Sequence, residues 1–358
     1  MSKEHQTRLA LPGKGTLESA TMTFLSECGM KVNRSNPRQY LARIHNIPDV
    51  EVVFQRATDI PSLVQDGDAA LGITGYDILA EHRGSGDTEG KEDDYDDDII
   101  VLERDLGYGN CRLVVAVPET WIDVSTCADL WHLAGYYATH KRRGLRIATK
   151  YPRLTAQFLR RHNITHCKII SPHGALEAAP LTDTADLIVD LTETGTTLRE
   201  NHLKLLDDGT ILHSQACLIG NAHLLRQNEQ VLRIASMMLE LIEARMQARN
   251  RSLLTASLQV ESTEEMQRIY AKLSSRLKSH VSTLEFYSNG EGSHKSGRQA
   301  YTLSGVVAVK GSATELLEIV AALRSAGATS INITPLTYRF GEESVHVRSL
   351  RERLKRIS

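Results

Sequence analysis

The sequence predicts an α/β fold in two or three domains, the last of them a ferredoxin-like βαββαβ unit. Three observations support this prediction. The 358 residues exceed what one compact core usually holds. Strand and helix signals alternate through the first half, which is typical of sheets covered by helices. The pattern then changes after the polar stretch 249–251, where we expect a domain junction.

The chain opens with an expected strand over residues 8–11, which ends in the turn Pro-Gly-Lys-Gly. Apolar residues at helical spacing predict a helix over 16–28, with Gly29 as its C-cap. Later apolar runs predict strands at residues 50–54, 69–73, 113–117, 145–148, 168–170, 185–191 and 210–219, and helices at 154–159 and 231–246. Because sheets of this kind bind ligands beyond the ends of their strands, those ends are the places to look for a site.

After the junction, the predicted order is strand, helix, two strands, helix and strand. These elements are expected at residues 253–260, 262–277, 281–287, 300–309, 314–323 and 329–333. Ser262 and Glu265 have the spacing of a capping box at the start of the first helix. The βαββαβ order defines the ferredoxin-like unit. It carries no evident catalytic cluster, which suits a regulatory or oligomerising role.

Composition limits the classes of function. A formal charge of −2 argues against nucleic-acid partners, which need a basic excess. Five widely spaced cysteines predict neither a zinc knuckle nor a disulfide framework, so we expect a reducing cytosolic or organellar compartment, with the cytoplasm as the predicted location. No signal peptide is expected at residues 1–15, and no apolar run approaches the length of a membrane span. The acidic stretch 84–98 is interpreted as a solvated, mobile insertion, since its aspartates lack the spacing of a calcium loop.

A strand runs into a small polar cluster within residues 186–203. A glycine- and threonine-rich turn after a strand points backbone N–H groups at one spot, which favours an anion. Threonine hydroxyls add donors without charge, and Gly195 allows the backbone to approach a ligand closely. We therefore expect a phosphate monoester in this turn.

Two acids flank the same turn and need a different partner. Asp190 and Glu193 would repel phosphate, so ribose hydroxyls or a magnesium ion are the expected partners. Together these features favour a ribose 5-phosphate. On this motif alone, a second interpretation stays open, in which the threonines only cap a helix and the acids lie in solvent.

Six segments resemble ATP phosphoribosyltransferase, the first enzyme of histidine biosynthesis. They occur in the family's order at residues 9–20, 59–79, 109–118, 146–159, 173–180 and 185–203. The resemblance covers about residues 8–250 and continues more weakly through 252–340, like the C-terminal domain of the long form. It implies transfer of phosphoribosyl from phosphoribosyl pyrophosphate to N1 of ATP, release of pyrophosphate, and a requirement for Mg²⁺.

The resemblance also implies roles for particular residues. The phosphoribosyl pyrophosphate site would comprise Asp190, Glu193, Thr194, Gly195, Thr196 and Thr197. Glu177 matches a second acid near the ribose, so Glu177 and Asp190 would be both the catalytic carboxylates and the metal ligands. The ATP site would comprise Lys14, Gly15, Arg56, Arg112 and Tyr151, each of which could instead be an ordinary surface or salt-bridging residue. Cys111 and Cys217 are expected to be core thiols.

The chain departs from the family pattern at two positions. Thr16 stands where the family usually has arginine, and Lys14 or Arg34 is expected to compensate for the lost charge. His202 stands where glycine is usual, which predicts a local change in how the preceding short helix ends.

The family's fold implies two α/β lobes like those of periplasmic binding proteins, with substrates in the cleft. Lobe I would comprise 1–114 and 215–250, lobe II 115–214, and the regulatory domain 252–358. In the long form that domain binds histidine as a feedback inhibitor, and the enzyme forms dimers and hexamers. The histidine contacts would be Ser282, Thr283 and Ser330. The basic tail after residue 340 would be a solvated helix or an oligomer contact.

Two further classes of function stay open. A non-enzymatic solute-binding protein would share the two-lobed layout, although the threonine turn with Asp190 argues against it. A catalytically silent regulatory paralogue is favoured only by Thr16.

Overall fold

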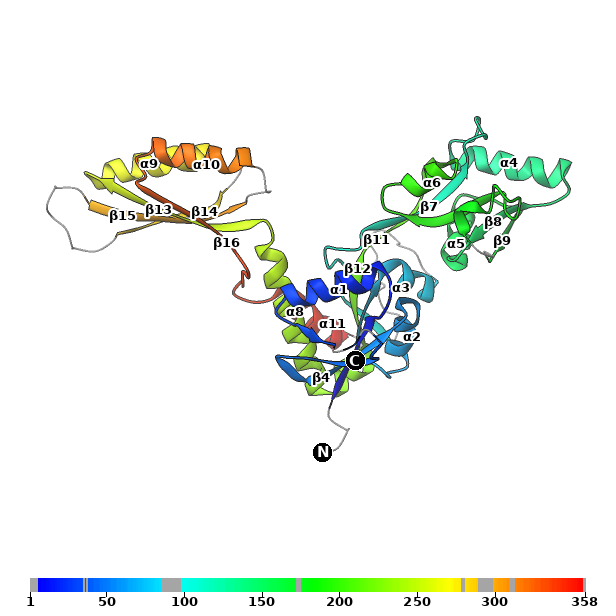
Figure 1. Cartoon of the computed structure of the whole chain (residues 1–358), viewed down its shortest axis with the longest axis horizontal. Coiled ribbons are helices and arrows are strands. Elements are labelled where there is room, and N and C mark those ends of the chain that lie inside the picture. The colour runs from blue at the N-terminus through cyan, green and yellow to red at the C-terminus, as the bar shows by residue number, and fades with distance from the viewer. Residues whose placement is uncertain are drawn as a thin grey trace. The chain divides into compact units, whose positions relative to one another are not determined.

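The computed structural model describes residues 6–34, 36, 38–84, 98–171, 175–277, 281–288, 299–308 and 313–356, with backbone alone at 281–283, 288 and 299. The chain forms two compact units, one of residues Met1–Leu239 with Val345–Ser358 and one of Glu240–Ser344. The first unit contains two sheets and the second contains one. Figure 1 labels some of the elements of each sheet.

The first sheet has seven strands in the order β2-β3-β4-β1-β5-β12-β6. Its strands are β1 (Thr7–Pro12), β2 (Val32–Asn33), β3 (Leu41–Ile44), β4 (Ile47–Gln55), β5 (Leu71–Gly75), β6 (Ile99–Glu103) and β12 (Ala216–Asn221). Its helices are α1 (Thr16–Glu27), η2 (Ala57–Asp59), α2 (Ile60–Gln65), α3 (Tyr76–Arg83) and α7 (Ala222–Gln227). Helix α8 (Glu229–Ala248) begins in the first unit and continues into the second. Strands β4, β1 and β5 are parallel neighbours, so their carboxyl ends share one edge of the sheet.

The second sheet has five strands in the order β11-β7-β10-β8-β9. They are β7 (Cys111–Pro118), β8 (Leu145–Thr149), β9 (Cys167–Ile170), β10 (Leu187–Thr192) and β11 (Leu203–Ser214), with helices α4 (Cys127–His140), α5 (Pro152–Arg161), η3 (Leu176–Ala178) and α6 (Thr196–Glu200). Strand β10 pairs in parallel with β8 and antiparallel with β7. The chain reaches this sheet between β6 and β7 and leaves it between β11 and β12.

The predicted α/β class and the division of the catalytic region between two sheets are confirmed. The chain crosses to the second sheet before Cys111, because all of β7 pairs with β10 and β11 of that sheet. The strand expected over 210–219 proves to be two strands in different sheets, which separate at Gln215. Only the sheet pairing reveals this break, because β11 pairs with β7 and β12 pairs with β5 and β6. The acidic segment expected to be mobile falls mostly at residues 85–97, outside the described residues.

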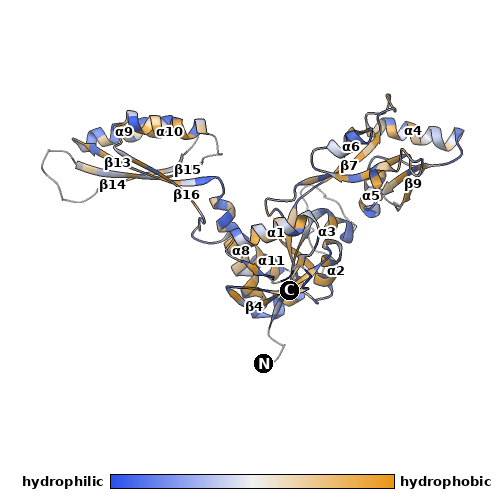
Figure 2. Ribbon diagram, in the orientation of Figure 1, coloured by the Kyte–Doolittle hydropathy of each residue, from blue (hydrophilic) through white to orange (hydrophobic). Residues whose placement is uncertain are grey.

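The second unit has the predicted ferredoxin-like order. It comprises β13 (Arg251–Val260), α9 (Thr263–Arg276), β14 (Val281–Ser288), β15 (Gln299–Ala308), α10 (Ala313–Ser325) and β16 (Ser330–Pro335). The antiparallel sheet has the order β14-β15-β13-β16. Ser262 caps α9 by accepting the Glu265 N–H at 3.2 Å, while the Glu265 carboxylate accepts from Glu261. In Figure 2, α9 alternates between hydrophilic and hydrophobic residues, as expected of a helix with one buried face.

The basic tail forms helix α11 (Val345–Arg356), which belongs to the first unit. Val347 and Leu350 are buried on this helix, and the Arg353 guanidinium donates to the Val101 carbonyl of β6 at 2.8 Å. The tail is therefore a helix, as expected, but it packs against the first unit and is not merely solvated; an oligomer contact stays a prediction. Because β6 is an edge strand, the helix covers a sheet edge that would otherwise be open. No helix among the described residues is both long and apolar enough to cross a bilayer.

Candidate functional site

The threonine-rich turn follows β10 at its carboxyl end. Gly195 is buried and has a φ of 78°, in the left-handed region that glycine tolerates best. Its N–H donates to the Thr192 hydroxyl at 2.8 Å, which closes the turn from strand to helix. Because a Cβ at Gly195 would meet no atom within 4 Å, the backbone conformation and not crowding by the protein requires glycine here.

The hydroxyls of the turn face solvent around this glycine. Thr194, Thr196 and Thr197 are exposed, and the hydroxyls of Thr194 and Thr196 lie 2.9 Å apart. The Arg199 guanidinium donates to the Thr196 hydroxyl at 3.5 Å. Arg199 is not among the residues predicted from the sequence, although its position three residues beyond Thr196 on a helix indicates a shared face. The turn therefore offers uncharged hydroxyl donors, with the Arg199 guanidinium beside them.

The predicted carboxylates Asp190 and Glu177 lie near one another. Burial raises the pKa of Asp190, and the negative charge of Glu177 acts in the same direction. The Leu191 N–H, which donates to Asp190 at 2.8 Å, and the nearby Lys150 cation partly oppose that increase. Lys150 carries no predicted role, although it directly follows β8, the parallel neighbour of β10.

The donor set of this pair fits a hard divalent cation. Mg²⁺ prefers oxygen ligands and usually takes one or two carboxylates together with substrate phosphates. Asp190 and Glu177 supply two carboxylates whose mutual repulsion a cation would relieve. The residues present are therefore compatible with the predicted metal.

A buried network links the two sheets near the same turn. The Tyr151 hydroxyl donates to Asp77 Oδ2 at 2.6 Å, and the Ser214 hydroxyl donates to Asp77 Oδ1 at 2.6 Å. Ser214 in turn accepts the Asp77 N–H at 2.8 Å. Burial and the Asp77 charge raise the pKa of Tyr151. The sequence predicts a role for Tyr151 in ATP binding but none for Asp77, although Asp77 lies just after β5.

The two cysteines near this region are not nucleophiles. Cys217 is fully buried, in agreement with the prediction of a core thiol. Cys111 is half-buried, and burial and the charge of Asp77 raise its pKa to about 11. Thiolate, the reactive form, is therefore scarce at neutral pH.

Predicted cationic residues lie at the carboxyl edges of both sheets. Lys14 and Gly15 follow β1, and Arg56 follows its parallel neighbour β4; all three are exposed. Arg112 on β7 pairs across the sheet with Thr192, directly before the threonine turn. The structure thus brings Lys14 and Arg56 to one edge and Arg112 to the base of the turn.

The structure shows the surroundings of Thr16 and His202, the two positions at which the chain departs from the family pattern. Thr16 is the first residue of α1 and is exposed. The Arg34 guanidinium pairs with Glu18 and stacks 3.9 Å from the Phe54 ring centroid, so it is already engaged by the protein. His202 has a φ of 55°, a backbone conformation that favours glycine, which explains why the family usually has glycine at this position.

The predicted histidine contacts lie in the third sheet. Ser330 is exposed at the start of β16 and pairs with Ser257. Ser282 and Thr283 belong to β14, but their side chains fall outside the described residues.

Comparison with known proteins identifies one family. A family model described as ATP phosphoribosyltransferase matches residues 56–244. The chain is 34% identical to ATP phosphoribosyltransferase 1, chloroplastic, of Arabidopsis thaliana over 342 residues, which are 95% of this chain and 79% of the relative. It is 41% identical to the ATP phosphoribosyltransferase of Brucella anthropi over 64% of this chain and 95% of the relative. A solved chain of the HisG:HisZ complex from Thermotoga maritima is similar over 66% of this chain, with 28% identity and a TM-score of 0.49.

Proposed function

The chain belongs to the ATP phosphoribosyltransferase family, and from this premise we propose how its residues divide the reaction. The reaction joins N1 of the adenine of ATP to the sugar carbon of phosphoribosyl pyrophosphate and releases pyrophosphate. The observation that carries our assignment is the pairing of an uncharged, exposed hydroxyl turn with a half-buried acid at the end of one strand, β10.

The threonine turn, residues 194–197, is proposed to hold the 5-phosphate. Its threonine hydroxyls offer donors to the anion, Gly195 sets the conformation of the turn through its positive φ, and Arg199 adds a positive charge behind them. Neutral donors suit a phosphate that must be bound firmly and released after each turnover. Glu193 is exposed beside the turn, where a sugar hydroxyl can reach its carboxylate.

Asp190 and Glu177 are proposed to act on the sugar. Displacement at this carbon passes through an oxocarbenium-like transition state, whose positive charge nearby carboxylates stabilise. The protein needs no nucleophile for such a displacement; it has to position N1 opposite the leaving group. When bound by Asp190 and Glu177, Mg²⁺ would neutralise charge on the leaving pyrophosphate.

ATP and pyrophosphate carry more charge, and we propose that they meet the cationic residues. Lys14 and Arg56 lie beyond adjacent strands of the first sheet, and Arg112 lies beside the threonine turn. Tyr151 is proposed to contact the nucleotide, with its hydroxyl oriented by Asp77. Closure of the two lobes, whose boundaries lie between β6 and β7 and at Gln215, would exclude water from the activated sugar.

Regulation and assembly are proposals from the long form of the family. We propose that histidine inhibits the enzyme through the third sheet at Ser282, Thr283 and Ser330, and that dimers and hexamers form in the cytoplasm. The chain bearing Ser330→Trp should retain activity and lose histidine inhibition. Thr334→Trp on the same strand is the control, and equal inhibition of both variants would place the effector elsewhere.

One assay tests the catalytic assignment. The purified chain with ATP, phosphoribosyl pyrophosphate and Mg²⁺ should form phosphoribosyl-ATP and an equal amount of pyrophosphate. Omission of Mg²⁺ should abolish both products. Tight binding of the substrates without turnover would instead support a silent regulatory paralogue, and binding of neither substrate would support a solute-binding protein.

A further inference from the structure

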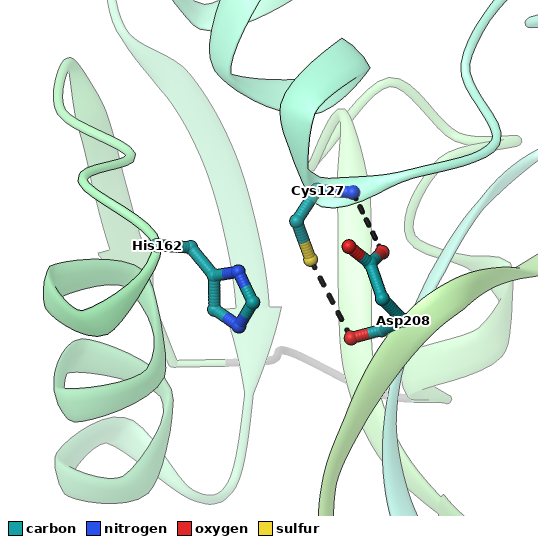
Figure 3. Close-up of side chains that lie close together, drawn as sticks. All are labelled: Cys127, His162 and Asp208. Atoms are coloured by element: carbon teal, nitrogen blue, oxygen red, sulfur yellow. Dashed lines mark hydrogen bonds between the residues drawn. The ribbon is translucent and has the colours of Figure 1, made fainter.

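Three side chains of the types that bind transition metals converge away from the proposed catalytic site. Cys127, His162 and Asp208 place a sulfur, an imidazole nitrogen and a carboxylate oxygen all within 4.8 Å of one another. They come from three elements: the first residue of α4, the residue after α5, and β11. Figure 3 shows the Cys127 sulfur between the His162 imidazole on one side and the Asp208 carboxylate on the other.

Contacts with the surrounding protein orient the two outer groups. The Cys127 N–H donates to Asp208 Oδ1 at 2.7 Å, which fixes the carboxylate and leaves its second oxygen toward the cluster. The His162 ring lies 4.4 Å from the Phe158 ring, centroid to centroid. Asp208 itself lies where the pairing of β11 with β7 shifts register, so the irregular strand brings this side chain to the start of α4.

The same three residue types can form a catalytic triad, but this geometry does not support one. Cys127 is 2% exposed, and burial together with the Asp208 carboxylate raises its pKa to about 12. Its Sγ–H donates weakly to the Asp208 carbonyl at 3.6 Å and not to the imidazole. A substrate could not reach this sulfur, and thiolate would be scarce at neutral pH.

We propose that Cys127, His162 and Asp208 bind one divalent ion of the zinc class. Thiolate and imidazole select zinc and its transition-metal neighbours, whereas Mg²⁺ and Ca²⁺ prefer oxygen ligands. The ion replaces the thiol proton, which is released to solvent, and forms bonds to sulfur, nitrogen and oxygen, with water in the fourth position.

The role of this site is structural. Helix α5 is about 15 Å long and separates His162 from the helix start beside Tyr151, where the catalytic site is proposed. The ion would tie together the start of α4, the end of α5 and the irregular part of β11. The inference does not depend on which substrates the other site binds.

Cobalt titration of the metal-free full-length chain tests the proposal. Co²⁺ should bind one per chain with a thiolate-to-cobalt charge-transfer band, and Zn²⁺ should displace it while excess Mg²⁺ should not. Cys127→Ser should remove the band. Asp208→Asn, which keeps an acceptor for the Cys127 N–H, should weaken binding at least tenfold, as should His162→Gln. Cys167→Ser, which changes another thiol of the same sheet, should change neither the band nor the affinity.

Thermal unfolding provides a second readout. Saturating Zn²⁺ should raise the Tm of the parent chain and of Cys167→Ser, and leave that of His162→Gln nearly unchanged. If Cys127→Ser does not fold, the His162 and Asp208 variants decide the question. Failure to bind Co²⁺, binding without the charge-transfer band, or an affinity in the His162 and Asp208 variants equal to that of the parent chain would overturn the proposal.

Discussion

The two ends of strand β10 carry the same residue type in opposite electrostatic states. At the amino end, Asp186 is buried and bonded to Arg143 at 2.8 Å and to Arg146, whose charges outweigh burial and lower its pKa. At the carboxyl end, burial and Glu177 raise the pKa of Asp190. One aspartate is fully paired within the protein, and the other is held in an unfavourable environment that a ligand can relieve. Perturbation of the second kind marks a functional site.

The largest expected effect is on catalysis at the carboxyl end. Asp190→Asn should reduce kcat by about 10²–10³-fold, or about 2.7–4 kcal/mol, because a neutral amide stabilises the developing positive charge poorly. Steady-state kinetics with both substrates measures it. Glu200→Gln, which changes an exposed acid at the end of α6, is the matched control and should have a near-normal kcat. Near-normal turnover in Asp190→Asn would remove this residue from the mechanism.

A substitution at the amino end of β10 should affect the stability of the protein and not its activity. Asp186→Asn should lower the free energy of unfolding by about 3 kcal/mol, because it leaves Arg143 and Arg146 without their shared buried partner. Denaturant unfolding measures the loss, and kcat of the folded fraction should be unchanged. A stable Asp186→Asn with reduced kcat would reverse the roles assigned to the two ends.

The turn beyond β10 should show a smaller effect on both properties. Gly195→Val should destabilise the chain by about 1–2 kcal/mol, because valine disfavours the positive φ. It should also weaken phosphoribosyl pyrophosphate binding about tenfold, measured by calorimetry, by crowding the ligand. Gly135→Val is the control: a Cβ there also meets nothing within 4 Å, but α4 requires no positive φ. Unchanged affinity in the Gly195 variant would argue against phosphate binding at this turn.

The smallest effect is the opposite response of the two aspartates to pH. Asp186 contributes stability that is present above its ordinary pKa of 3.8 and is lost as pH falls toward its lowered folded-state pKa. Asp190 has a raised folded-state pKa, so its contribution is unfavourable at neutral pH and is relieved by acid. Tm measured against pH should therefore fall less on acidification in Asp186→Asn than in the parent. Asp190→Asn should raise Tm at neutral pH; a lower Tm there would contradict the assigned environment.

Short-range sequence patterns predicted the residues at the carboxyl end of β10 but not the ion pairs at its amino end. Asp190 and Gly195 lie within one short stretch of sequence, so the strand, the acid and the glycine turn could be interpreted together. The arginines that pair with Asp186 lie 43 and 40 residues away, and Asp77 meets Ser214 across 137 residues. Such contacts depend on strand order, which short-range patterns do not encode. The packing of the tail helix could not be predicted for the same reason, because its partner β6 lies more than 200 residues earlier.

A crystal structure with bound phosphoribosyl pyrophosphate would locate the sugar phosphate. We expect the 5-phosphate within hydrogen-bonding distance of residues 194–197 and the ribose hydroxyls at the Asp190 carboxylate. A sugar phosphate bound instead at the cationic edge beside Lys14 and Arg56, with the threonine turn empty, would refute the roles assigned to the turn and to Asp190.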